Sequence, residues 1–231
     1  MPYRRLPNTD QARSRALRAV VEIGETSTVS DLAISLNSLS EARNFMLKLD
    51  RTLTHYTQCY ANQSRASHKH QANAKMARLY LSHFIQVLNL SVLREEIKPS
   101  QKQLYGLPEA NVVPDLLSES ALAEWGEKVI KGEQERVARG GIPIYNPTIA
   151  RVKVHYDIFM ESYGRQKNLQ LLTSRSLEAL AALREPADKL ILDIWNQVEA
   201  RFQNVQPNER RLELCRSYGL VYYYRNNEKT S

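Results

Sequence analysis

The feature that most constrains the fold of this chain is an apolar pattern that occurs twice. In two places, five apolar or aromatic residues recur with 3-4-3-4 spacing, and each pair of counterparts is separated by the same distance along the chain. This spacing puts all five side chains on one side of a helix, and such a seam must pack against another helix. The first stripe is Met46, Leu49, Leu53, Tyr56 and Tyr60, and the second stripe is Ile149, Val152, Tyr156, Phe159 and Tyr163.

Two further segments match in the same order after the stripes. Three matches in one order favour an internal duplication, and the growing offset between copies predicts extra helical turns at the tip of the second hairpin. The first match sets Leu79, Leu81, Phe84, Gln86 and Val87 against Leu190, Leu192, Trp195, Gln197 and Val198. The second match sets Tyr105, Gly106 and Leu107 against Tyr218, Gly219 and Leu220, where Gly is expected to end a helix in the left-handed conformation.

The predicted fold class is therefore all-α, a pseudo-symmetric helical bundle built from two duplicated long helical hairpins, with a minor two-stranded β-ribbon. Two hairpins with complementary apolar faces can bury one another in this way. The scarcity of glycine, 8 in 231 residues, also favours helix. Beyond the two stripes, the expected core contains Tyr80, Leu88, Ile191, Ile194 and Phe202.

Five segments are expected along the chain. They are an arm with a short helix (1–37), the first hairpin repeat (38–107), a connecting segment with one helix (108–145), the second hairpin repeat (146–220) and a tail (221–231). Ser38 with Glu41 predicts a capping box before the first long helix, and Asn146 with Pro147 predicts the start of its counterpart. The short helix is expected to end at Gly24.

The tail contains Val221–Tyr224, a run of strong strand formers. Because a lone strand cannot satisfy its own backbone groups, the tail is expected to pair with 142–145 or, alternatively, across a subunit interface. Adjacent strand residues face opposite sides, so Tyr222, Tyr223 and Tyr224 cannot all be core residues. These three tyrosines are the candidate interface.

Charge is unevenly placed along the chain, whose net charge is +7. Residues 1–100 contain 14 basic and 8 acidic residues, whereas residues 101–231 contain 18 and 17. Such asymmetry is typical of a polyanion-binding face, and it also fits an ordinary solvated surface. The candidate polyanion contacts are Arg4, Arg5, Arg13, Arg15 and Arg18.

A search for catalytic and metal-binding motifs assigns no catalytic, cofactor-binding or metal-binding residue. The chain contains no Glu-x-x-His pair, HExxH, CxxC, GxSxG or glycine-rich phosphate loop. His68 and His70 stand two positions apart, so a helix would point their rings to opposite sides, and a polar hairpin tip is the favoured place for them. No cofactor is expected.

Cysteine usage and hydropathy predict a cytoplasmic protein without a membrane segment. Cys59 and Cys215 lie far apart in predicted helices, which indicates reduced thiols. No stretch approaches the roughly 18 apolar residues of a membrane span, and the N-terminus lacks the apolar run of a signal peptide.

Several segments, MPYRRLPNTDQAR, ARLYLSHFIQVLN, EWGEKVIKGE with GGIPIYNPTIA, and YGLVYYYRNNE, resemble an uncharacterised family of all-helical proteins from Bacteroidetes-type bacteria. The resemblance covers nearly the whole chain. It implies a cytoplasmic all-helical protein and brings no activity, substrate or catalytic residue with it.

The leading functional hypothesis is a non-enzymatic helical scaffold or protein-interaction protein, which binds an unknown protein partner or itself. The first alternative is a nucleic-acid-binding protein that uses the basic N-terminal half. The second is a ligand-binding or enzymatic bundle with a cryptic site between the two copies.

Overall fold

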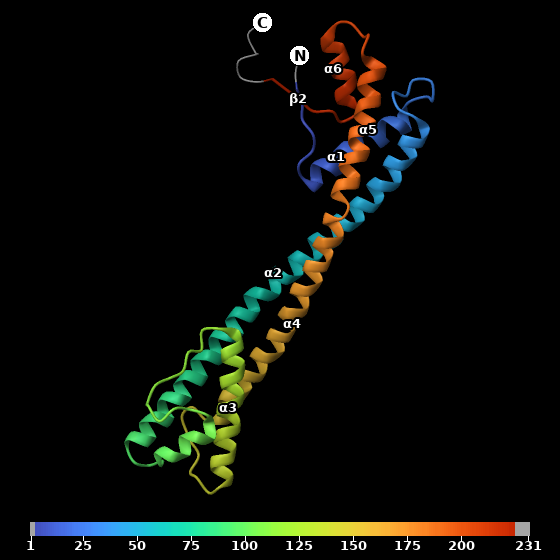
Figure 1. Ribbon diagram of the computed structural model, residues 1–231. Coiled ribbons are helices and arrows are strands. Elements are labelled where there is room, and N and C mark those ends of the chain that lie inside the picture. The colour runs from blue at the N-terminus through green and yellow to red at the C-terminus, as the bar shows by residue number, and fades with distance from the viewer. Residues whose placement is uncertain (1–2, 225–231) are drawn as a thin grey trace. The chain divides into compact units, whose positions relative to one another are not determined.

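The computed structural model describes residues 3–224 and confirms the all-α prediction (Figure 1). In chain order the helices are α1 (Asp10–Thr26), α2 (Leu36–Leu93), η1 (Pro99–Tyr105), α3 (Glu119–Ala138), α4 (Ile149–Ala181), α5 (Arg184–Phe202) and α6 (Asn208–Ser217), where η1 is a 3-10 helix. The strands β1 (Tyr3–Arg4) and β2 (Tyr222–Tyr223) are each two residues long. Among residues 3–224, no helix has both the length and the apolar character that crossing a membrane requires.

The chain divides into two units. Unit 1 comprises Met1–Cys59 and Thr173–Ser231, and unit 2 comprises Tyr60–Leu172, so the long helices α2 and α4 contribute residues to both. Each unit has its own hydrophobic core. These units cut across the repeats expected at 38–107 and 146–220.

The core of unit 1 forms where α1, the first part of α2, α5 and α6 pack together. The buried side chains include Leu17 of α1, Leu49 of α2, and Ile194 and Trp195 of α5. Polar contacts fix the helix directions, because Gln197 lies beside Ser38 and Tyr56 lies near Arg184. Within unit 1, α2 and α5 are therefore antiparallel.

The core of unit 2 combines the second part of α2 with α3 and the first part of α4. The fully buried side chains include Phe84, Leu88, Leu122 and Phe159. A glycine in α3 permits a close approach of α4, because a Cβ on Gly126 would lie 2.3 Å from the ring of Tyr156.

A buried polar network joins the first Tyr-Gly-Leu segment to α3. The Tyr105 hydroxyl donates to Glu133, and Arg136 Nε donates to the Tyr105 oxygen at 2.7 Å and to Glu133 at 3.0 Å. The backbone N–H of Ile144 also donates to Glu133 at 3.0 Å, and Arg136 reaches the carbonyl of Ile142. Burial raises the pKa of the Tyr105 phenol, so the hydroxyl stays protonated and serves as a donor.

The two Tyr-Gly-Leu segments end helices in the same way. Gly106 and Gly219 both have positive φ angles, 66° and 84°, after a helix. The leucine N–H that follows each glycine bonds back to the carbonyl of Lys102 or Cys215, which is the hydrogen-bond pattern of a left-handed helix C-terminus. The capping interpretation of these segments is confirmed.

The two apolar stripes face inward, but into different cores. The first stripe packs in unit 1 through Leu49, although Tyr60 at its end is 57% exposed, and the second packs in unit 2 through Val152 and Phe159. The segments that match after the stripes lie in the opposite units from the stripes of their own copies. Phe84 of the first copy lies in unit 2, and Trp195 of the second copy lies in unit 1. Each core therefore combines the stripe of one copy with the later segment of the other, and the duplication itself stays a prediction.

The prediction of a helical hairpin within 38–107 is wrong, because α2 runs without interruption from Leu36 to Leu93. Those residues include no glycine or proline, so nothing breaks the helix at the polar stretch that was expected to turn. In the second repeat, only Ala182 and Leu183 separate α4 from α5. Leu183 keeps right-handed helical angles (φ −88°, ψ −11°), and α5 follows α4 without a reversal (Figure 1).

Three predicted helix boundaries, two starts and one end, also differ in the structure. The side chain of Ser35 caps α2 by accepting from the N–H of Ser38, and that of Thr148 caps α4, so Ser38 and Asn146 are not the caps. Helix α1 continues through Gly24 to Thr26. A Cβ on Gly24 would lie 2.3 Å from the side chain of Leu39, so glycine serves close packing at this position.

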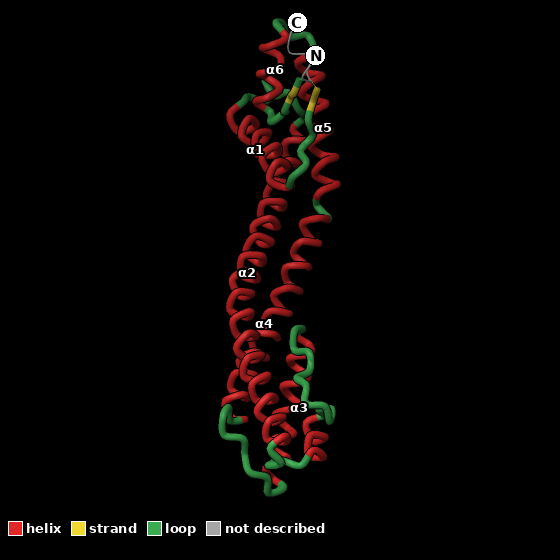
Figure 2. The backbone as a smooth tube through the Cα atoms, turned by 90° about the vertical axis from the view of Figure 1, so that its left-hand side faces the viewer, coloured by secondary structure: helices red, strands yellow, loops and turns green. Residues whose placement is uncertain are grey.

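The two-stranded ribbon exists, but its expected partner was wrong. Strand β2 pairs antiparallel with β1, with Tyr3 opposite Tyr223 and Arg4 opposite Tyr222 (Figure 2). Arg4 and the Tyr222 hydroxyl both bind Glu199 of α5, at 2.9 and 2.7 Å, which anchors the ribbon on unit 1. In the segment expected as partner, Ile142 is 75% exposed and Tyr145 bridges only to Thr148.

Deleting residues 221–231 is expected to lower the melting temperature without changing the oligomeric state. The deletion removes β2 and the hydroxyl that binds Glu199, while β1 loses its backbone partner. Calorimetry and light scattering check the two parts of this prediction. A dimer that becomes a monomer on deletion would instead show that the tail is a subunit interface.

Candidate functional site

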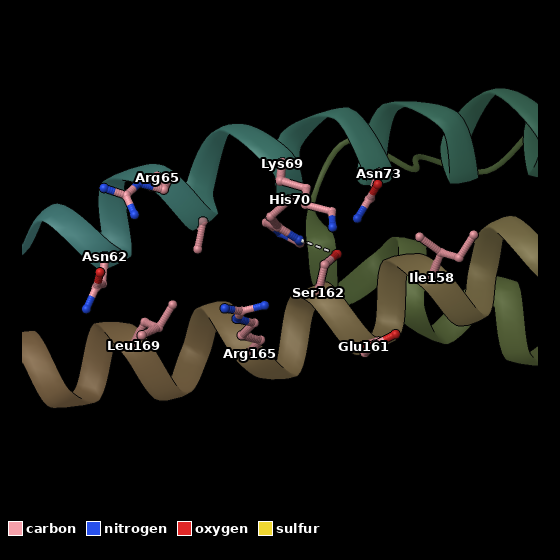
Figure 3. Close-up of a pocket in the computed structure, with 11 residues that line it drawn as sticks. Asn62, Arg65, Lys69, His70, Asn73, Ile158, Glu161, Ser162, Arg165 and Leu169 are labelled. Atoms are coloured by element: carbon pink, nitrogen blue, oxygen red, sulfur yellow. Dashed lines mark hydrogen bonds between the residues drawn. The ribbon is translucent and has the colours of Figure 1, made fainter. Parts of the chain in front are cut away.

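The candidate site is a groove of about 420 Å³ between α2 and α4 in unit 2 (Figure 3). Contacts at His70–Ser162 and Tyr80–His155 show that the two helices run antiparallel here. The residues that line the groove are Asn62, Arg65, Ala66, Lys69, His70, Asn73, Ile158, Glu161, Ser162, Arg165 and Leu169.

His70 forms the floor of this groove and joins three helices. The side chain is 3% exposed, and its Nδ1 lies 3.0 Å from Ser162 Oγ of α4. Its Nε2 lies 2.8 Å from Glu119 Oε1, in the first turn of α3. The ring also stacks near Phe159 and Tyr163, with centroid separations of 5.8 and 6.0 Å. These contacts hold α2, α3 and α4 in register beneath the groove.

The Glu119–His70–Ser162 arrangement has the same group types as a hydrolase triad. Its geometry favours a structural role, because Ser162 Oγ also donates to the carbonyl of Phe159 at 2.9 Å. A hydroxyl has one proton and cannot donate it to both the carbonyl and His70. Ser162 also lies inside α4, where helical hydrogen bonds occupy the nearby backbone N–H groups that could stabilise an oxyanion.

Three cations line the groove without an acidic partner. Arg65 and Lys69 extend from α2 and Arg165 extends from α4 (Figure 3). None of the three forms an ion pair with the residues that the structure describes, and Glu161 is the acidic residue in the lining. The apolar part of the lining is Ala66, Ile158 and Leu169. The groove therefore presents excess positive charge beside an apolar wall.

Part of this site could have been found in the sequence. Between Asp50 and Glu95 the chain contains no acidic residue, so a helix over this range must carry uncompensated charge. The expected place for His68 and His70, a hairpin tip, is wrong, since both lie inside α2. Their predicted opposite orientation is confirmed, because His70 is buried and His68 is exposed. The contribution of Arg165 and Ser162 from α4 had no sequence signal.

The five arginines predicted as polyanion contacts fall into two groups. Arg4 pairs with Glu199 at 2.9 Å, Arg13 with Asp188 at 2.7 Å, and Arg18 with Asp50 at 2.8 Å. The hydrogen bond to Asp188 raises the pKa of Arg13. Arg5 and Arg15 have no acidic partner among the described residues, and both line one pocket of unit 1.

The three tyrosines predicted as an interface also differ from one another. Tyr222 is partly buried against the core of unit 1 and donates to Glu199. Burial and this hydrogen bond raise the pKa of its phenol. Tyr223 and Tyr224 are exposed, and the ring of Tyr223 lies 5.8 Å from that of Tyr3. A partner could therefore reach Tyr223 and Tyr224 more readily than Tyr222.

Comparison of the chain with protein-family models, with curated proteins and with solved structures finds no match. Within residues 3–224, no group of three or more His, Cys, Asp or Glu side chains is placed to hold a metal ion.

Proposed function

We propose that this protein is a non-enzymatic protein-interaction protein whose unit 2 groove binds an acidic segment of a partner protein. The observation that carries the proposal is the convergence of Arg65, Lys69 and Arg165 on one groove without acidic partners. A partner's carboxylates would supply the missing counter-charges. Arginine is well suited to this role, because its planar guanidinium binds a carboxylate through two parallel hydrogen bonds.

The remaining lining favours a peptide over a nucleic acid. Ala66, Ile158 and Leu169 offer apolar contact that the side chains of a peptide can use and a sugar-phosphate backbone cannot. Within the described part of the chain, the lining contains no Tyr, Trp or Phe on which bases could stack, and such stacking is a main source of single-strand binding. The volume of about 420 Å³ lies within the range typical of ligand pockets and would hold a few side chains.

Buried polar contacts tie together the helices that form the groove. His70 links α2 to Glu119 and Ser162 below the binding surface, so the backbone segments from which the cations extend are held in place. Preorganisation of this kind lowers the entropic cost of binding. Asn62 and Asn73 carry side-chain amides that can donate to and accept from the backbone of an extended peptide.

Replacing both groove arginines should weaken binding to an acidic peptide. Fluorescence anisotropy with a labelled peptide of alternating Glu and Leu measures the affinity. We expect the Arg65→Gln/Arg165→Gln variant to lose about tenfold or more, because each charged hydrogen-bonded contact contributes about 1.5–3 kcal/mol. The matched control is Lys75→Gln, which removes an exposed cation of α2 outside the groove and should leave the affinity unchanged.

Labelled oligo-dT in the same assay separates the peptide proposal from the nucleic-acid alternative. Tighter binding of oligo-dT, lost in the arginine variant, would favour a nucleic acid as the ligand. Absence of peptide binding by the unaltered protein would refute the proposal. The basic arm supports the nucleic-acid alternative poorly, since Arg4, Arg13 and Arg18 are engaged with acidic residues of unit 1.

We also propose that the protein is cytoplasmic and that it belongs to the bacterial family that its sequence resembles. Both cysteines, Cys59 and Cys215, are free in the structure, which suits a reducing compartment. Self-association through Tyr223 and Tyr224 remains the alternative form of the interaction hypothesis, and the tail deletion described above tests it.

A further inference from the structure

A second pocket, of about 430 Å³, lies in unit 1 and is separate from the groove of the proposed function. It forms where the segment after β1 and the first turns of α1 meet α5 and residues Gly219 and Val221. Its polar and aromatic lining includes Arg5, Arg15 and Trp195. Most of the other lining is apolar, with Leu6, Pro7, Ala12, Ala16 and Val221.

The charge of this pocket is not balanced. Arg5 and Arg15 form no ion pair with a described residue, whereas Arg4, Arg13 and Arg18 of the same arm are all paired. Among the residues that the structure describes, the lining of this pocket contains no acidic residue. Two guanidinium groups therefore border one apolar space without a counter-charge.

Trp195 also belongs to the lining of this pocket, although the residue is only 1% exposed. A ligand in the pocket would therefore lie against the edge of the indole side chain. The two unpaired arginines and the apolar residues around them point to a ligand that carries negatively charged oxygen atoms and an apolar body.

We propose that the unit 1 pocket binds a small organic carboxylate with an apolar body. The carboxylate matches the planar forks of Arg5 and Arg15, and the apolar body matches the wall formed by α1 and Val221. An inorganic anion would leave that wall without a partner, and a neutral ligand would leave both arginines unpaired. The volume of about 430 Å³ fits a molecule of this kind.

Intrinsic fluorescence can report on this pocket directly. The chain contains 2 tryptophans, and the other one, Trp125, lies in unit 2. In a Trp125→Phe background, excitation at a wavelength that tyrosine does not absorb gives a signal from Trp195 alone. We expect titration with sodium hexanoate to change this signal saturably, and hexanamide and inorganic phosphate to have much weaker effects.

Variants then locate the binding. Arg5→Gln/Arg15→Gln should weaken hexanoate binding about tenfold or more, because two charged hydrogen-bonded contacts are lost. The single variant Arg15→Gln should also weaken hexanoate binding. It replaces the double variant in the test if the double variant fails to fold. Arg210→Gln, an exposed arginine of unit 1 outside the pocket, should have no effect. The groove variant Arg65→Gln/Arg165→Gln should also bind hexanoate normally, so the two proposals can fail separately.

Three outcomes would overturn the carboxylate assignment. The first is no saturable response to hexanoate, and the second is an equal response to hexanamide, which would leave the arginines without a role. The third is phosphate binding as tight as hexanoate binding, which would mean that the apolar wall has no role in binding.

Discussion

Replacing Glu133 with Gln is expected to destabilise unit 2 by about 3–5 kcal/mol, the cost of breaking a buried ion pair on one side. Glu133 is 0% exposed and Arg136 is 2% exposed, so the guanidinium would stay buried without its counter-charge. Glutamine has nearly the same shape as glutamate, and the effect therefore reports on charge and hydrogen bonding. Urea unfolding followed by circular dichroism measures the change.

The matched control for this variant is Glu135→Gln in the same helix. Glu135 pairs with Arg139, but both side chains are well exposed. Exposed ion pairs typically contribute about 0–1 kcal/mol, so the control should change stability little. Equal effects of the two variants would mean that the Tyr105–Glu133–Arg136 network is not buried as the structure shows.

Trp195→Ala is expected to cost about 3–5 kcal/mol in unit 1, because removing a large buried ring leaves a cavity. The ring, which α5 carries, is almost fully buried and belongs to the core of unit 1. Its sequence counterpart Phe84 is fully buried in unit 2, and Phe84→Ala should have an effect of similar size there. Thermal and urea unfolding of each variant provide the measurement.

Leu192→Ala controls for the loss of side chain and helix propensity in α5. Leu192 is 37% exposed and lies outside the core, so we expect a much smaller change. If Trp195→Ala were as mild as Leu192→Ala, the inward face of α5 would be wrongly assigned. The same result would weaken the use of Trp195 as a reporter on the unit 1 pocket.

Local features of the chain could be predicted well, because they depend on neighbours in sequence. The 3-4-3-4 stripes indicated the inward faces of α2 and α4, and the side chains of Thr9 and Ser118 cap α1 and α3 locally. The Tyr-Gly-Leu segments end helices because glycine reaches positive φ at little cost. An all-helical chain with a short ribbon followed from such signals.

Errors arose where a polar stretch was interpreted as a turn. Residues 64–75 are mostly polar, yet they contain neither glycine nor proline, and they continue as part of α2. Polarity shows that a helical face is solvated, whereas a reversal needs residues that interrupt backbone hydrogen bonds. Attention to helix breakers alone would have predicted the long helix.

The candidate site was only partly predictable for a related reason. The absence of acidic residues from residue 51 to residue 94 predicts excess positive charge on α2. It does not predict which of the cations lack an acidic partner. Arg4, Arg13 and Arg18 looked like Arg5 and Arg15 in the sequence, and only the fold brought Glu199, Asp188 and Asp50 beside the first three. Pairing of charges is a property of distances in space.

The sequence by itself therefore determined which segments are helical and which of their faces are apolar, since helix periodicity and capping act over a few residues. The tertiary structure decided which faces meet. It placed the first stripe with Trp195 and the second with Phe84, paired β2 with β1, and brought Arg165 across from Arg65 and Lys69. Several apolar faces of similar character can satisfy one another, so the choice among them depends on the packing of the whole core.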